Sequence, residues 1–298
     1  MRQPGIINKG ENYEYFVYKG KWGEYIMRKL TIDEMKETQL NMLKEFDRIC
    51  RENKLRYSLC GGTLLGAIRH NGYIPWDDDI DVMMPRPDFE QLMKIRNEGR
   101  FIFKSPMEQN EGRPYIYSYG KMLDTYTELI EFPNSKKIIS NVYIDIFPID
   151  GIPNEDAEHL KLYKKIHRLV LINRALEISY YNRSDRTQSV INRIFWSILW
   201  NVRNALPPKV IMKKIEELVQ KRNFDEEERV GSLVAGYGPK EKFLKRDFEI
   251  MKKDFEGYEF SIIKGYDFYL RILYKDYMQL PPYEKRVAAH DCIAYEVK

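Results

Sequence analysis

The sequence predicts an α+β fold: a mixed sheet core flanked by helices, followed by a mainly helical C-terminal extension. Up to about residue 150, stretches with apolar residues at three- and four-residue steps alternate with short segments rich in Tyr, Ile, Phe and Val, and from residue 154 helical patterns dominate. With 298 residues, 43% hydrophobic and 32% charged, the composition is that of a globular protein and excludes disordered and collagen-like classes. We expect an N-terminal extension over 1–30, a core over 31–150 and a mainly helical region over 151–298.

The core begins with a helix, because apolar residues recur at helical spacing over 32–54 and Thr31 stands before them in the position of an N-cap. The elements expected after it in the core are a strand over 56–60, a helix over 63–71, a strand within 77–84 that begins near Asp79, a helix over 87–98 and strands over 101–105, 115–124, 126–132 and 141–147. The second half is predicted to hold helices over 155–181, 188–206 and 209–223, a hairpin near 248–263 that turns at Gly257, and a helix over 265–278.

Charge, cysteine content and hydropathy limit the function classes. The 49 Lys and Arg against 45 Asp and Glu leave a net charge of +4, which permits an anionic ligand or an acidic membrane surface but is too sparse for a protein that coats nucleic acid. Three scattered cysteines indicate reduced thiols rather than a zinc ribbon or a disulfide framework. No secretory signal is visible, and the least polar window, 194–200, is far shorter than the roughly 20 residues that span a bilayer. We expect a cytoplasmic protein without a nucleic-acid partner.

Asp79 and Asp81 are the first candidates for chemistry. Because alternate residues of a strand share a face, both carboxylates are predicted to point the same way while Ile80 and Val82 enter the core. Two adjacent carboxylates repel each other unless a cation lies between them, and oxygen ligands suit Mg²⁺ or Mn²⁺. The alternative is a solvated acidic strand end. An EF-hand is excluded, because the positions that require Gly and Glu hold Val82 and Asp88.

A third carboxylate lies in the apolar segment 142–147. An unpartnered charge at Asp145 would be costly inside such a strand, so we expect Asp145 to share a metal or to accept the proton of an attacking hydroxyl. Asp150 lies nearer a loop and is the lesser candidate. The predicted catalytic residues, which are also the predicted metal ligands, are therefore Asp79, Asp81 and Asp145.

A glycine turn precedes the acidic segment. Gly61, Gly62 and Thr63 follow a strand and open a helix, where the backbone can approach a ligand closely and free N–H groups favour a phosphate. The alternative is a tight connection without a ligand. Arg69 and His70, at the end of that helix, are predicted either to contact a diphosphate or to be solvated helix-end charges.

Other candidates are spread along the chain. Lys121 lies on a predicted strand and is expected to contact a phosphate, since a buried point charge needs a partner. Trp76 directly precedes the acidic run and either packs in its loop or stacks on a base or a quaternary ammonium. Lys285, Arg286 and His290 form a basic tail that either closes over a nucleotide or lies on the surface.

The segment GGTLLGAIRHNGYIPWDDDIDV (61–82), followed by MPRPDFEQLM, resembles the signature of the LicD family, bacterial phosphocholine transferases of the nucleotidyltransferase superfamily that are related to fukutin-type transferases. YGKMLDTYT (119–127), YIDIFPIDGIP (143–153) and the segment 255–286 are similar as well, so that the resemblance covers roughly residues 32–290. It implies a nucleotidyltransferase-like core, a phosphate-binding turn at Gly61 and Gly62, and an acidic triad of Asp79, Asp81 and Asp145. Fukutin-type members carry a zinc-binding insert, for which this chain has no cysteine cluster.

The resemblance also implies a reaction. Members of this family use Mg²⁺ or Mn²⁺ and move a phospho-alcohol, most often phosphocholine, from a CDP-alcohol donor such as CDP-choline to a hydroxyl of a glycan or lipid-linked glycan, with release of CMP. Acceptors of this kind are precursors of lipopolysaccharide, teichoic acid or capsule. Two alternatives stay open: nucleotide transfer from an NTP with release of pyrophosphate, and a catalytically silent glycan- or lipid-binding module.

The predicted helix over 188–206 has one apolar face, with Trp196 and Trp200 at its edge and Arg193 and Arg203 opposite. A helix of this kind either packs into the core or lies on a membrane surface. Peripheral contact with the inner face of the membrane therefore remains an alternative for this otherwise cytoplasmic protein.

Overall fold

The structure, a computed structural model, describes residues 5–10, 13–20, 23–95, 99–107, 115–131, 138–182, 189–287 and 291–297, and the side chains from residue 27 onward except those of 180–182. The α+β class predicted from the sequence is confirmed, because a mixed sheet and several helices share one hydrophobic core.

Seven strands form the central sheet. Their bounds are β4 Ser58–Leu59, β5 Asp81–Pro85, β6 Phe101–Lys104, β7 Gly120–Asp124, β10 Tyr143–Gly151, β11 Arg229–Gly231 and β12 Lys242–Leu244. They run in the order β12-β11-β10-β5-β4, with β7 paired to β10 and β6 paired to β7. The central strands β5 and β10 are parallel, whereas the other pairings between these strands are antiparallel. The sheet is therefore mixed, and its two parallel strands lie at its centre.

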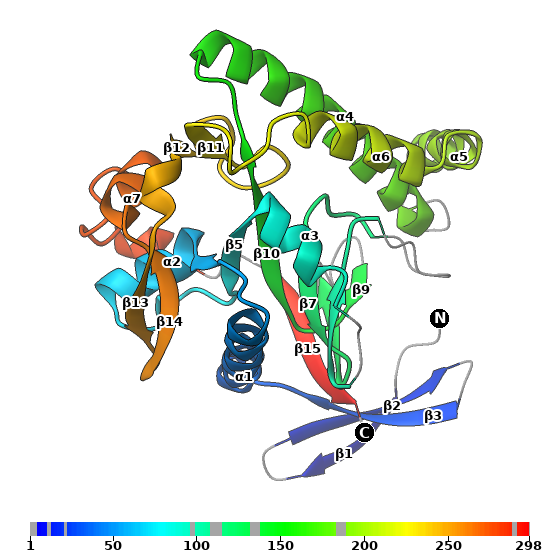
Figure 1. Cartoon of the computed structure of the whole chain (residues 1–298). Coiled ribbons are helices and arrows are strands. Elements are labelled where there is room, and N and C mark those ends of the chain that lie inside the picture. The colour runs from blue at the N-terminus through cyan, green and yellow to red at the C-terminus, as the bar shows by residue number, and fades with distance from the viewer. Residues whose placement is uncertain are drawn as a thin grey trace.

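The structure describes seven α-helices, of which α1, α2 and α3 pack against this sheet. Their bounds are α1 Ile32–Glu52, α2 Gly61–Arg69, α3 Arg86–Leu92, α4 Asp156–Asn182, α5 Val190–Ala205, α6 Pro208–Val219 and α7 Tyr266–Tyr274. Thr31 caps α1 as predicted: its hydroxyl accepts a hydrogen bond from the Glu34 backbone N–H, and the Glu34 carboxylate accepts one from the Thr31 backbone N–H. Figure 1 shows α1, α2 and α3 around β5 and β10, and α4 and α6 grouped at one end of the sheet.

A second sheet joins both ends of the chain. Its order is β1-β2-β3-β15-β8-β9, with bounds β1 Gly5–Gly10, β2 Tyr13–Gly20, β3 Gly23–Lys29, β8 Thr127–Glu131, β9 Ile138–Ser140 and β15 Cys292–Val297. The strands of the first 30 residues and β15 were not expected from the sequence. β15 pairs with β3 on one side and β8 on the other, and such partners, distant in sequence, leave no local pattern.

The C-terminal region keeps the predicted hairpin and last helix. The hairpin consists of β13 Ile250–Phe255 and β14 Tyr258–Ile263, and Gly257 turns with a positive φ of 76°. Several expected elements are shorter than predicted. The helix over 87–98 ends at Leu92 and the strand over 115–124 begins only at Gly120; the strand over 56–60, the helix over 209–223 and the helix over 265–278 are also shortened, to Ser58–Leu59, Pro208–Val219 and Tyr266–Tyr274.

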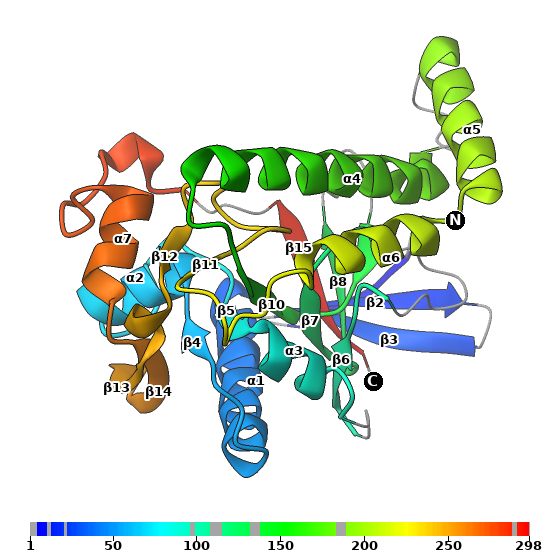
Figure 2. The same ribbon diagram turned by 45° about the horizontal axis from the view of Figure 1, so that its top comes forward.

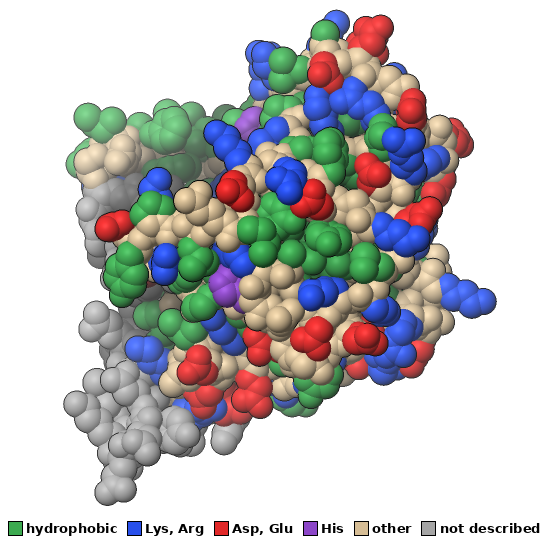
Figure 3. All heavy atoms as spheres, turned by 90° about the vertical axis from the view of Figure 1, so that its left-hand side faces the viewer, with side chains coloured by type: hydrophobic (Ala, Val, Ile, Leu, Met, Phe, Trp, Pro, Cys, Tyr) green, Lys and Arg blue, Asp and Glu red, His purple; other side chains and the backbone are tan. Residues whose placement is uncertain are grey.

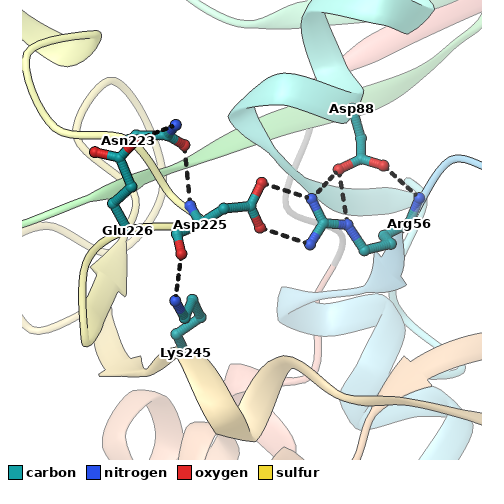
Figure 4. Close-up of polar contacts among 6 residues, drawn as sticks. All are labelled: Arg56, Asp88, Asn223, Asp225, Glu226 and Lys245. Atoms are coloured by element: carbon teal, nitrogen blue, oxygen red, sulfur yellow. Dashed lines mark hydrogen bonds and ion pairs between the residues drawn. The ribbon is translucent and has the colours of Figure 1, made fainter.

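One guanidinium links the helical region to the core. Arg56 donates hydrogen bonds to the Asp88 carboxylate on α3 (2.7 and 2.9 Å) and to Asp225, which follows α6 (2.9 Å). Lys245 donates a hydrogen bond to the carbonyl oxygen of Asp225 (2.5 Å) and so holds the same loop from the other side. Figure 4 shows Arg56 lying between the two carboxylates. These contacts therefore join the segment before β4 and the first turn of α3 to the loop that follows α6.

Candidate active site

The structure brings Asp81 and Asp145 side by side. Asp81 is the first residue of β5 and Asp145 the third residue of β10, and the parallel register pairs these two positions directly. Residues paired in this way on neighbouring strands point to the same face of a sheet. Asp145 is 7% exposed, and Ile80 and Val82 are fully buried, as the alternating pattern predicted. The strand itself starts two residues later than expected, so that Asp79 lies in the loop that enters it.

The carboxylates of this loop also converge. One oxygen from each of Asp77, Asp78 and Asp79 lies within 4.8 Å of the others, which makes this loop, among the described residues, a group that could hold a metal ion. Burial raises the pKa of Asp81 well above its ordinary value. The negative charges of Asp79, Asp145 and Asp77 raise it further. A donor set made only of carboxylate oxygens, whose mutual repulsion a cation would relieve, fits Mg²⁺ or Mn²⁺. The acidic loop 77–79 therefore meets the chemical requirement for a divalent site, and Asp81, whose pKa responds to the charges of Asp79 and Asp77, stands outside that three-residue group.

Gly61 and Gly62 leave room for the carboxylates of Asp81 and Asp77, because glycine has no Cβ. A Cβ on Gly62 would lie 2.5 Å from Asp77 Oδ2, and a Cβ on Gly61 would lie 3.1 Å from Asp81 Oδ2. Gly61 also has a positive φ of 53°, which favours glycine. Thr63 also contacts the acidic strand: its hydroxyl accepts a hydrogen bond from the Asp81 backbone N–H (2.8 Å). The turn thus brings the start of α2 against the acidic residues.

Lys121 is the cationic partner of Asp145. Its Nζ lies 2.6 Å from Asp145 Oδ1, and the side chain is only 1% exposed. Tyrosine rings enclose the ammonium, with Nζ 3.1 Å from the ring centroid of Tyr143 and 4.0 Å from that of Tyr117. The hydroxyl of Tyr119 donates a hydrogen bond to the other Asp145 oxygen (3.2 Å). The buried charge of Asp145 is therefore already compensated within the protein, which the sequence argument for a metal there did not foresee.

Asp150, the lesser candidate, has a structural partner. It is completely enclosed, and Arg86 donates two hydrogen bonds to its oxygens (2.7 and 3.0 Å). Burial raises the pKa of Asp150, although the Arg86 charge opposes the shift. A bidentate pair of this kind joins the start of α3 to the end of β10 and leaves Asp150 no free oxygen for a ligand.

A cavity of about 690 Å³ opens beside the glycine turn. Gly62 and Asp77 line one side of it, and the C-terminal segment 276–287 lines another. Arg69 and Trp76, two of the sequence candidates, also line it, and Arg286 lies over the Trp76 ring with its guanidinium carbon 5.5 Å from the ring centroid. Figure 3 faces the side of the molecule that carries α2, β13, β14 and α7, where apolar side chains gather among acidic and basic ones. The basic tail therefore contributes at least Arg286 to a cavity wall.

The remaining candidates make contacts of other kinds. The His70 ring packs edge-on against Trp76, with 6.3 Å between centroids, and burial lowers the pKa of His70. Arg69 donates a hydrogen bond to the carbonyl oxygen of Tyr277 (2.7 Å), which anchors the C-terminal segment to α2. Lys285 lies in a short 3₁₀ turn, and His290 lies outside the described residues.

The sequence argument missed several residues at this site. Tyr237 and Tyr274 line the cavity, and their hydroxyls are hydrogen-bonded to each other. The Tyr237 hydroxyl also comes within 3.3 Å of the position that a Gly61 Cβ would take. Gly236 and Gly238, both with positive φ, flank Tyr237, and this Gly-Tyr-Gly triplet is a signal for a tight loop that sequence inspection could have noticed.

The chain is similar in sequence to known proteins. Residues 54–168 match the family model described as LicD/FKTN/FKRP, nucleotidyltransferase domain. The chain is 30% identical over 275 residues to the lipopolysaccharide cholinephosphotransferase LicD of Haemophilus influenzae, with 90% of this chain and 99% of that protein covered. It is 25% identical over 169 residues to the uncharacterized protein RT0683 of Rickettsia typhi, which covers 53% of this chain and 51% of that protein. The matched region contains the glycine turn, the acidic loop, Lys121 and Asp145.

Proposed function

Because the chain belongs to the LicD family of cholinephosphotransferase-type enzymes, we propose that it transfers phosphocholine from CDP-choline to a hydroxyl of a glycan, with release of CMP. The observation that carries this proposal is the pairing of Asp81 with Asp145 next to the Gly61–Gly62 turn and the cavity. We further propose that residues 31–150 form a nucleotidyltransferase-like core. The relative from Haemophilus influenzae acts on lipopolysaccharide by its name, and a lipid-linked glycan is therefore the acceptor class that we propose for this chain.

The acidic residues would hold the divalent ion. In our proposal Asp79 and Asp81 are its principal ligands, with Asp77 and Asp78 close enough to complete the oxygen set, and the chemistry that the bound ion supplies is neutralisation of the donor diphosphate. The N-terminus of α2, whose first two residues are Gly61 and Gly62, favours a phosphate through its backbone N–H groups.

Asp145 is the proposed proton acceptor. The acceptor hydroxyl attacks the phosphorus that carries choline, the bond from that phosphorus to the CMP oxygen breaks, and the hydroxyl proton passes to the Asp145 carboxylate. Lys121 holds this carboxylate from one side and Tyr119 from the other, so its orientation is defined before a ligand binds. We propose that Lys121 positions Asp145 rather than contacting the donor, which revises the phosphate contact expected from the sequence.

The cavity suits a donor that has both cationic and anionic parts. Trp76, Tyr237 and Tyr274 present aromatic rings to it, and aromatic faces attract a quaternary ammonium. Arg69 and Arg286 line the same space and would favour the phosphates or the departing CMP. This combination supports a choline donor over an uncharged alcohol.

Product analysis tests the proposal. The purified protein should release CMP from CDP-choline in the presence of Mg²⁺ or Mn²⁺ and a lipopolysaccharide acceptor, and Asp81→Asn should lower this rate by about a hundredfold or more while the melting temperature stays near that of the parent. Thr125→Ala, a change at an exposed turn away from the site, is the matched control and should leave the rate unchanged. Pyrophosphate release from an NTP, or an unchanged rate in Asp81→Asn, would refute the assignment.

A further inference from the structure

Helix α5 presents most of its apolar face to solvent. The side chains of Ile191, Ile194, Phe195 and Ile198 are 79%, 56%, 52% and 56% exposed, and no residue of α5 is buried. The opposite side contacts α4: Arg203 forms an ion pair with Glu177 of α4 (3.1 Å), and its guanidinium lies over the Trp200 ring. Leu199 packs against a buried apolar cluster, but the rest of this face is exposed, so packing of the whole face into the protein's own core, one of the two interpretations open from the sequence, is wrong. Figure 2 shows α5 beyond the end of α4, rising away from the rest of the molecule.

The exposed apolar surface continues past the helix. Val190 precedes this row at the start of α5, and Val202, Leu206 and Val210 extend it toward α6; all four are exposed. A surface hollow of about 420 Å³ borders the row, lined on one edge by apolar side chains and on the other by Arg193, Ser197 and Asn201. Soluble monomers rarely leave a contiguous apolar patch of this kind uncovered.

The charge of this segment indicates what covers it. Residues 189–215 contain five basic residues and no acidic residue: Arg193, Arg203, Lys209, Lys213 and Lys214. Glu177 and Glu217 pair with two of them, Arg203 and Lys214, and the side chains of Lys209 and Lys213 are exposed beside the apolar row. A second copy of this chain would bring a like-charged segment against this one, whereas an anionic surface complements it.

We propose that α5 and the start of α6 bind the surface of a bilayer that contains anionic phospholipid. Among the described residues, no helix is long and apolar enough to cross a membrane, and α5 has only 16 residues, about 24 Å of helix. An amphipathic helix of this size lies in the interface with its apolar side chains among the acyl chains and its basic side chains at the headgroups. Such binding would hold the protein at the surface where lipid-linked molecules reside, and it does not depend on the proposed reaction.

Vesicle flotation of the intact protein tests this directly. The protein should float with vesicles of phosphatidylcholine and phosphatidylglycerol and bind more weakly when the salt concentration is raised or when phosphatidylglycerol is omitted. The double variant I191S/F195S should bind roughly a hundredfold more weakly, because two large apolar side chains no longer enter the bilayer. I32S/F268S is a matched control, since Ile32 and Phe268 are 58% and 53% exposed elsewhere on the surface, and it should bind like the parent.

A second variant, which changes charge and leaves the apolar side chains intact, tests the proposal even if I191S/F195S fails to fold. K209Q/K213Q alters only exposed lysines and should weaken binding to anionic vesicles roughly thirtyfold without changing the melting temperature. Failure of the parent to float, or parent-like flotation of I191S/F195S, would overturn the proposal. Light scattering gives a further outcome. If the parent protein is a dimer that does not bind vesicles, and I191S/F195S dissociates this dimer, then α5 forms an interface between copies and the membrane proposal is overturned.

Discussion

The substitution Gly62→Ala should separate activity from stability. The new Cβ would lie 2.5 Å from Asp77 Oδ2, whereas ordinary carbon–oxygen contacts begin near 3.4 Å, so the Asp77 carboxylate must move by about 1 Å. Gly62 lies inside α2, where alanine is favoured over glycine by roughly 0.5–1 kcal/mol, and its φ is not positive. We therefore expect equal or slightly higher stability together with a disturbed acidic loop. A displacement of this size at a reacting centre costs about a hundredfold in rate.

Two measurements on the purified variant give the result. Metal-dependent CMP release from CDP-choline should fall by about a hundredfold, and the melting temperature should not fall. The Asp77→Ala background is the control: because the clash is with Asp77, adding Gly62→Ala there should lower the rate by less than about twofold. Wild-type activity in the single variant, or an equal loss with and without Asp77, would refute the claim that Gly62 acts by making room for this carboxylate.

Two further predictions concern stability. Arg86→Met should lower the free energy of unfolding by about 3–5 kcal/mol, because Asp150 is left as a buried charge without its partner. Denaturant unfolding measures this change, and an unchanged stability would show that the ion pair is unimportant. Burial raises the pKa of Glu241 above its ordinary value of 4.5 although Tyr269 and the Tyr237 backbone donate hydrogen bonds to it. Since the folded protein holds this proton more tightly, the stability from Glu241 is complete below pH 4.5 and is lost as the pH rises through the raised pKa. Glu241→Gln should flatten the melting temperature between acidic and neutral pH, and an unaltered profile would contradict this.

Local patterns predicted the elements that carry the site. The alternation of Asp79, Ile80, Asp81 and Val82 indicated which side chains enter the core, and the apolar neighbours of Asp145 indicated its burial. Both conclusions need only the period of a strand, which is a property of adjacent residues.

Register and partners could not be predicted in this way. The compensation of Asp145 by Lys121 depends on the antiparallel pairing of β10 with β7, and the neutralisation of Asp150 depends on Arg86 in a separate element. Lys121 was expected to contact a phosphate because its partner Asp145 lies 24 positions away in the chain and no periodicity connects the two residues. Tyr237 and the C-terminal cavity wall could not be predicted either, because they come from the last quarter of the chain and meet α2 only in the folded structure.

The position of a bound Mn²⁺ ion shows whether Asp79 and Asp81 are the metal ligands. In crystals of the protein soaked with Mn²⁺ and CDP-choline, the anomalous signal should place the ion about 2.1 Å from carboxylate oxygens of Asp79 and Asp81, on the side of the glycine turn. An ion held elsewhere, or a donor bound with its diphosphate away from these two carboxylates, would show that Asp79 and Asp81 do not form the metal site.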